Sequence, residues 1–225
     1  MMEFRTTKLD QAQVRIETRE DEKRFITGYA AVFYREGEEG TEYWLYRDLV
    51  ERISPKAFKR ALKEKDDVRA LFNHDANQLL SRIGSGLKLK TDEVGLRYEF
   101  PVDENDPDHQ RVVAKIERGD LSGSSFGFFP EKRIFIEEED FDVVVVESVR
   151  LVDVSPVTFP AYTGTEVGVR NTYPQKDCEV GKRNQDAIGE LLKERDDWKI
   201  KKNRISDEEQ SKLIANQLKA NAGIQ

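Results

Sequence analysis

Short apolar runs separated by turn-forming residues mark the first two thirds of the chain. Runs of about 4 to 8 residues rich in β-branched and aromatic side chains, bounded by turn signals, predict β-strands. The pattern is found in Phe25–Phe33, Val68–Asn73, Gly95–Phe100, Ser124–Pro130 and the longer stretch Asp140–Phe159. This part of the chain therefore predicts a β-rich domain.

Two helices are expected between these strands. One opens at Ser54-Pro55 and the other at Asp106-Pro107, because serine and aspartate cap helices and proline suits the first helical turn. Apolar residues follow each pair at helical spacing: Phe58, Ala61 and Leu62 in the first, and Val112, Val113 and Ile116 in the second.

The composition changes after residue 171. Residues 172–186 are polar and are interpreted as a linker, which contains Cys178 as a solvated thiol. Amphipathic helical segments then start near Ile188 and Ser206. We therefore predict a domain over 1–171, followed by a linker and a charged helical tail over 172–225.

Composition and charge narrow the class of protein. The 225 residues are 36% charged and carry a formal net charge of -7, which argues against general affinity for nucleic acid or anionic membranes. No apolar run approaches the roughly 20 residues of a membrane helix, and the first residues lack the apolar stretch of a signal peptide. A single cysteine excludes an internal disulfide and fits a reducing compartment.

Only two histidines are available as bases near neutral pH. His74 ends an apolar strand-like run, a place where site residues often lie, although a surface histidine at a strand end is the alternative. His109 lies three and four residues before Val112 and Val113, so it is interpreted as a packing residue on the buried stripe of the second helix.

The segment from Gly119 to Phe129 carries a candidate nucleophile. In the predicted strand, Ser125 and Gly127 share one face, and small residues there let another chain approach the backbone. A nucleophilic serine needs that openness. A glycine-rich edge strand with incidental serines, including Ser124, remains the alternative.

An acidic residue inside the apolar strand that ends the domain is the third candidate. Asp153 and Glu147 lie on one face of this strand, and a buried acid is costly without a partner. An imidazole is one such partner, and a charge on a solvated face is the alternative. The acidic run Ile136–Asp142 is interpreted as a solvated hairpin tip, and the sequence predicts no metal site and no cofactor.

From about Arg24 to about Arg170 the chain resembles the prohead proteases of tailed phages. The resemblance rests on six segments in order along the chain: GYAAVF, SPKAFKRAL, ALFNHD, GLRYEF, IERGDLSGSSFGF and LVDVSPVTFPAY. That family looks like the herpesvirus assemblins. The resemblance implies a mainly β, α+β fold: a closed or nearly closed β-barrel of about seven strands surrounded by helices.

The resemblance also implies serine endopeptidase activity on capsid-assembly proteins. It assigns Ser125 as nucleophile, with Ser124 in reserve, and His74 as base. The herpesvirus enzymes use a second histidine as third member, which this sequence lacks after His109, so Asp153 is the expected replacement and Glu147 the reserve. Backbone amides in a turn expected near Ser155–Thr158 are one candidate for oxyanion stabilisation, and the sequence does not identify the donors.

The major capsid protein and its scaffold segment are the implied substrates, together with the protease itself. The implied location is the procapsid in the host cytoplasm, and the herpesvirus relatives suggest a homodimer. Two other functions are considered: a non-catalytic β-barrel scaffold protein of the phage head, and a hydrolase that uses Asp153 and Glu147 as paired carboxylates.

Overall fold

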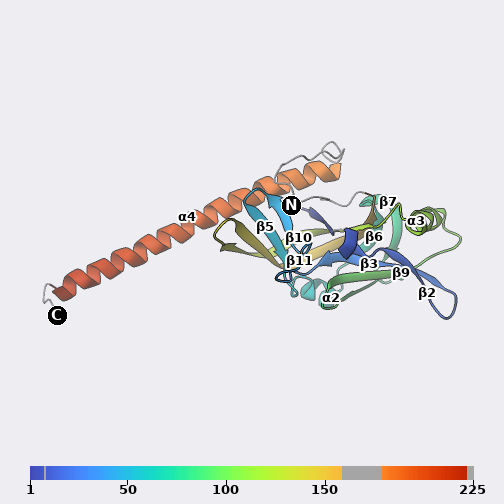
Figure 1. The fold of residues 1–225 in the computed structure, drawn as a ribbon, viewed down its shortest axis with the longest axis horizontal. Coiled ribbons are helices and arrows are strands. Elements are labelled where there is room, and N and C mark those ends of the chain that lie inside the picture. Colours follow the sequence, from blue (N-terminus) through green and yellow to red (C-terminus); the bar gives the residue numbers. More distant parts are fainter. Residues whose placement is uncertain (8, 159–178, 222–225) are drawn as a thin grey trace. The chain divides into compact units, whose positions relative to one another are not determined.

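The computed structural model describes residues 1–7, 9–158 and 179–221, and Figure 1 shows the ribbon. Eleven strands are found in these residues: β1 Glu3–Thr7, β2 Arg15–Thr18, β3 Arg24–Val32, β4 Tyr43–Tyr46, β5 Leu49–Ile53, β6 Arg69–Phe72, β7 Asp75–Arg82, β8 Lys88–Thr91, β9 Gly95–Pro101, β10 Gly123–Glu137 and β11 Asp142–Val157. The helices are α1 Leu9–Ala12, α2 Lys59–Glu64, α3 Pro107–Glu117 and α4 Glu179–Asn221.

The larger sheet has seven strands and is built around a long antiparallel hairpin of β10 and β11. Its order is β1-β10-β11-β5-β4, and β6 also pairs with β11 and carries β7. Both β5 and β6 run parallel to β11, along different stretches of it. Strands β10, β11 and β6, which come from distant parts of the chain, therefore lie next to one another.

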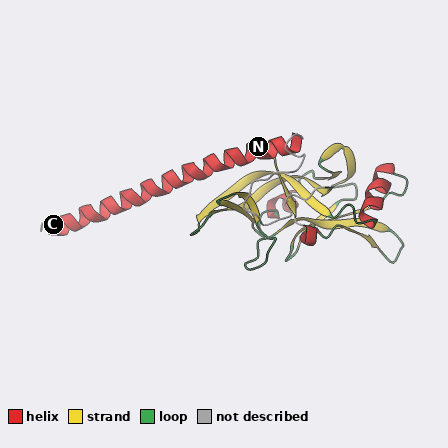
Figure 2. Ribbon diagram, turned by 45° about the horizontal axis from the view of Figure 1, so that its top comes forward, coloured by secondary structure: helices red, strands yellow, loops and turns green. Residues whose placement is uncertain are grey.

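The smaller sheet has four strands in the order β2-β3-β9-β8. Aromatic side chains from both sheets fill the core, among them Phe100 on β9 and Phe126 and Phe128 on β10, all fully buried. Figure 2 shows that strands dominate this part of the molecule and that its helices are short. The predicted α+β class is confirmed, whereas the closed barrel is not, because the described strands pair as two separate sheets.

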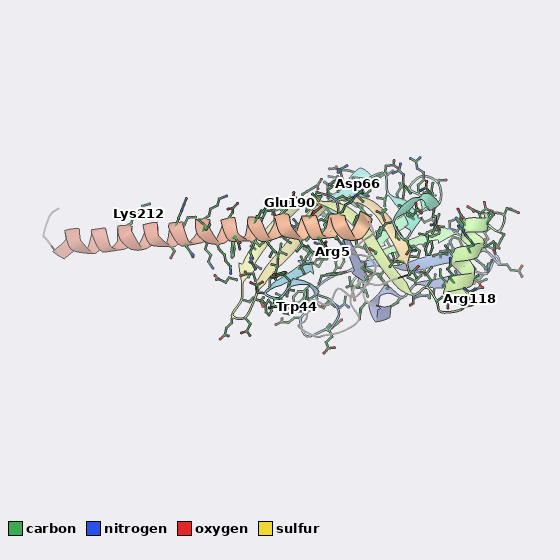
Figure 3. All side chains as sticks on the ribbon, turned by 90° about the horizontal axis from the view of Figure 1, so that it is seen from above. Arg5, Trp44, Asp66, Arg118, Glu190 and Lys212 are labelled. Atoms are coloured by element: carbon green, nitrogen blue, oxygen red, sulfur yellow. The ribbon has the colours of Figure 1, made fainter. Side chains whose placement is uncertain are left out.

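Helix α3 begins where the sequence predicts. The Asp106 side chain accepts a hydrogen bond from the Asp108 amide at 2.8 Å, which caps the helix, and Val112, Val113 and Ile116 are buried. The helix ends beside Arg118, which is labelled in Figure 3.

Helix α2 is shorter than its pattern predicts. Residues 55–58 form turns, and Phe58 takes the cap position without a side-chain hydrogen bond. The Ser54 hydroxyl accepts instead from the Lys56 amide at 3.2 Å, so it stabilises the turn before the helix. Lys65, with φ 56°, then ends α2 in the left-handed region.

The chain divides into two compact units, Met1–Asn184 and Gln185–Gln225. The predicted boundary at 171/172 and the predicted linker thiol Cys178 lie outside the described residues. Helix α4 is one continuous helix rather than two segments, since no proline interrupts it and Ser206 lies within it. None of the described helices combines the length and the apolar character that crossing a membrane requires.

Candidate active site

His74 lies in a tight two-residue turn between β6 and β7. Asn73 and His74 are its central residues, and both adopt left-handed backbone angles, with φ 56° and 60°. Such turns match the twist of a hairpin, and they usually carry Asn-Gly because side chains disfavour positive φ. Asparagine and histidine are among the residues that tolerate this region. The turn holds the imidazole at the end of a strand, as the sequence predicts.

Asn73 ties this turn to the end of β11. Its amide donates to the Pro156 carbonyl at 3.1 Å. Its side chain accepts from the Thr158 amide at 2.8 Å and donates to the Thr158 hydroxyl at 3.0 Å. These three bonds restrain an unfavourable backbone conformation. Asn73 was not predicted as a site residue, although an asparagine before the candidate base is a turn signal.

His74 joins the other two candidate residues through its two ring nitrogens. Nδ1 lies 2.5 Å from Asp153 Oδ1, and Nε2 lies 2.7 Å from Ser125 Oγ. Ser125 and Asp153 are each 1% exposed. When Nδ1 donates its proton to the carboxylate, Nε2 is free to accept the serine proton, which is the arrangement that activates a serine hydroxyl.

The pairing of β10 with β11 sets the positions of the serine and the acid. Ser125 lies opposite Ser155, and Gly127 lies opposite Asp153. A Cβ atom at Gly127 would lie 2.3 Å from Asp153 Oδ2, closer than real contacts allow. A glycine is therefore needed here for the carboxylate to reach His74.

Ser155 is a further polar group in the site. Its hydroxyl donates to Asp153 Oδ1 at 2.8 Å and lies 3.3 Å from His74 Nδ1, and the residue is fully buried. A buried carboxylate needs such donors to remain charged. The sequence pattern did not predict this role for the Ser155 side chain.

A comparison with known protein families identifies the family of this chain. The family model described as caudovirus prohead serine protease matches residues 10–177, more than half of the chain. The chain belongs to this family. Among solved structures, the bacteriophage T4 capsid assembly protease, gp21, matches with a TM-score of 0.45 and 13% identity, over 71% of this chain and 97% of the T4 chain. No curated protein matches the chain.

The two reserve residues of this prohead protease lie elsewhere. The Ser124 hydroxyl contacts the Tyr98 hydroxyl at 3.3 Å, and burial raises the pKa of that phenol. Glu147 pairs with Lys132, with the carboxylate 2.6 Å from the ammonium group. The described contacts therefore bring Ser125 and Asp153, and neither reserve residue, to His74.

His109 packs on α3 as predicted. The residue is 4% exposed, its Nδ1 accepts from the Asp103 amide at 3.0 Å, and its Nε2 lies 2.6 Å from the Leu80 carbonyl oxygen. Both ring nitrogens are engaged with backbone groups, which suits a structural histidine.

The prediction of a turn at Ser155–Thr158 is wrong. Strand β11 continues through Val157, and Pro156 stays in register opposite Ser124. Proline fits an extended strand where its missing donor is not needed, and here its carbonyl accepts from Asn73. The Thr158 amide is already bonded to the Asn73 side chain, so it is not available as an oxyanion donor.

The acidic run is a hairpin tip between β10 and β11, as predicted. The Glu138 amide donates to the Phe141 carbonyl at 3.0 Å to close the turn, and the Glu138 carboxylate pairs with Arg52. No group of three or more histidine, cysteine or acidic side chains suited to a metal ion is found in the described residues.

Proposed function

We propose that this prohead protease is a serine endopeptidase in which Ser125 is the nucleophile, His74 the general base and Asp153 the residue that orients the base. The observation that carries the proposal is the unbroken chain of contacts from Asp153 through the imidazole to Ser125, at 2.5 and 2.7 Å. Free serine is a weak nucleophile, and an adjacent, oriented base is what activates it.

In the proposed reaction, Ser125 Oγ attacks the carbonyl carbon of the scissile peptide bond while His74 Nε2 takes the hydroxyl proton. The tetrahedral intermediate collapses as His74 returns that proton to the leaving amine, which gives an acyl-enzyme. A water molecule, deprotonated by His74, then hydrolyses the ester. Asp153 holds the Nδ1–H tautomer and stabilises the imidazolium formed in each half of the reaction.

We further propose that the substrates are the major capsid protein and its scaffold segment, and the protease itself, inside the procapsid in the host cell. The family assignment supports capsid proteins as the class of substrate. A homodimer and a nearly closed barrel remain predictions from the likeness to assemblins.

Co-expression of the protease with its capsid protein tests the nucleophile. Ser125→Ala should abolish the shortened capsid product, with a loss of roughly 10⁶-fold in kcat for a triad serine. Ser124→Ala, the adjacent buried serine, is the matched control and should retain cleavage. Full cleavage by Ser125→Ala would refute the assignment and favour the hydrolase that uses Asp153 and Glu147 as paired carboxylates. Absence of the shortened product with the wild type would favour the non-catalytic scaffold function.

A further inference from the structure

Strand β1 lies beside the candidate nucleophile, as the neighbour of β10 in the sheet. It runs antiparallel along β10, with Thr6 opposite Ser125 and Arg5 opposite Phe126. The Ser125 hydroxyl contacts the Arg5 carbonyl oxygen at 2.9 Å, and Ser125 is only 1% exposed. A peptide substrate cannot bring its own carbonyl to Ser125 while β1 occupies this edge of β10.

The contact with β1 also competes for the serine proton. A hydroxyl has one hydrogen to donate, and Ser125 Oγ lies 2.9 Å from the Arg5 carbonyl oxygen and 2.7 Å from His74 Nε2. When the hydrogen goes to Arg5, the base cannot take it. The Phe4 ring adds a second obstruction, since its centroid lies 4.5 Å from that of the His74 imidazole.

Two sets of contacts hold β1 in place. The Asn184 side-chain amide pairs with the Phe4 backbone, accepting from its N–H and donating to its C=O, both at 2.9 Å. Arg5, labelled in Figure 3, makes a bidentate pair with Glu51 at 2.6 and 3.0 Å, and Glu51 is fully buried. The first contact closes the outer edge of β1, and the second fixes its side-chain register.

We propose that β1 is an inhibitory strand, and that the substrate is an extended peptide segment that takes its place along β10 with a basic side chain opposite Glu51. This inference rests on the proposed serine peptidase function and names its substrate class and regulation. Strand β1 precedes residues 10–177, so it lies outside the part of the chain that matches the family model.

The groups that β1 would leave exposed on β10 and at Glu51 favour an extended peptide with a basic side chain. Once β1 leaves, β10 presents unpaired backbone donors and acceptors beside Ser125, and an extended peptide pairs with such an edge. Departure of Arg5 also removes the bidentate partner of Glu51, a buried carboxylate that is costly to leave unpaired. Arginine fits the vacated position better than lysine, because its planar guanidinium forms two parallel bonds with a carboxylate.

The first test releases β1 without touching the site. Asn184→Ala removes both bonds to the Phe4 backbone, and Gln185→Ala, an exposed neighbour on the same helix, is the matched control. We expect Asn184→Ala to raise the rates of fluorophosphonate labelling of Ser125 and of peptide cleavage about tenfold over the wild type, from two lost hydrogen bonds. Gln185→Ala should match the wild type.

The second test supplies β1 in trans. A synthetic peptide of residues 1–7, MMEFRTT, should inhibit the Asn184→Ala protein at a concentration about tenfold lower than the same peptide with Arg5→Gln. Fluorogenic peptides with arginine in place of glutamine at the corresponding position should be cleaved faster. Equal inhibition by the two peptides would overturn the role of Glu51.

The outcomes separate this inference from the proposed function. Efficient labelling and cleavage by the wild type, unchanged or reduced in Asn184→Ala, would overturn the inhibitory strand and leave the peptidase standing. Absence of labelling and cleavage in every variant, with capsid co-expression also negative, would overturn the peptidase and this inference with it.

Discussion

Ser155→Ala should slow the prohead protease although this side chain is buried away from solvent. The Ser155 hydroxyl donates to Asp153 Oδ1, the same oxygen that faces His74 Nδ1. Its loss leaves the carboxylate with one fewer donor and freer to rotate away from the imidazole. Ser155 is thus a positioning residue, which acts on Ser125 only through Asp153 and His74.

The expected fall in kcat for Ser155→Ala follows from the loss of a hydrogen bond to a charged carboxylate. A hydrogen bond to a charged group contributes about 1.5–3 kcal/mol. At about 1.36 kcal/mol for each factor of ten in rate, kcat should fall roughly 10- to 150-fold. The loss should stay below the roughly 10⁴-fold expected when the acid itself is replaced by its amide. KM should change little, because Ser155 is 0% exposed and does not touch substrate.

Steady-state cleavage of a fluorogenic peptide measures this change, with thermal melting to confirm the fold. Ser124→Ala is the control, since it removes a neighbouring buried hydroxyl whose contact is with Tyr98 rather than with the three candidate residues. An unchanged kcat in Ser155→Ala, or an equal loss in both variants, would refute the reasoning.

Three further predictions concern the acids and the glycine. Asp153→Asn should lower kcat/KM by up to about 10⁴-fold, whereas Glu147→Gln should leave it nearly unchanged; the reverse order in a cleavage assay would exchange their roles. Gly127→Ala should lower kcat about 100-fold, because a Cβ 2.3 Å from Asp153 Oδ2 forces a shift of about 1 Å; wild-type kinetics would contradict this. Hydrogen bonds from Arg24 and Gln110 lower the pKa of Glu104 from 4.5 to about 2. The contribution of Glu104 to the free energy of unfolding is therefore present above pH 4.5 and lost as the pH falls toward 2. In urea denaturation at a series of pH values, Glu104→Gln should reduce the fall in the free energy of unfolding over this range.

Local sequence signals made these three side chains candidates, and the resemblance to prohead proteases then assigned their roles. A histidine at a strand end, a serine on a strand of small residues and an acid in an apolar strand each break the usual pattern of their element. Because the chain has only two histidines, and His109 lies on an apolar helical stripe, His74 was the remaining base. The structure places His74 within hydrogen-bond distance of Ser125 and Asp153.

The strand over Ser125 was missed for a physical reason. Segment Glu3–Thr7 is polar and charged, and hydropathy treats such residues as exposed. Arg5 is nevertheless buried because Glu51 neutralises it from 46 residues away, and no local pattern reveals a partner at that distance. The hydroxyl of Ser155 escaped notice for a similar reason, since serine within a strand carries no sign of its partner.

The positions of the three site residues along the chain have a consequence for how activity first arises. Ser125 is 51 residues from His74, and His74 is 79 residues from Asp153, so each pair meets only through long-range strand pairing. Contacts of this kind form late, after the entropy of closing large loops has been overcome. A chain still emerging from the ribosome therefore lacks the proposed catalytic arrangement, and on the proposed function cleavage can begin only once β11 has been synthesised and has paired with both β10 and β6.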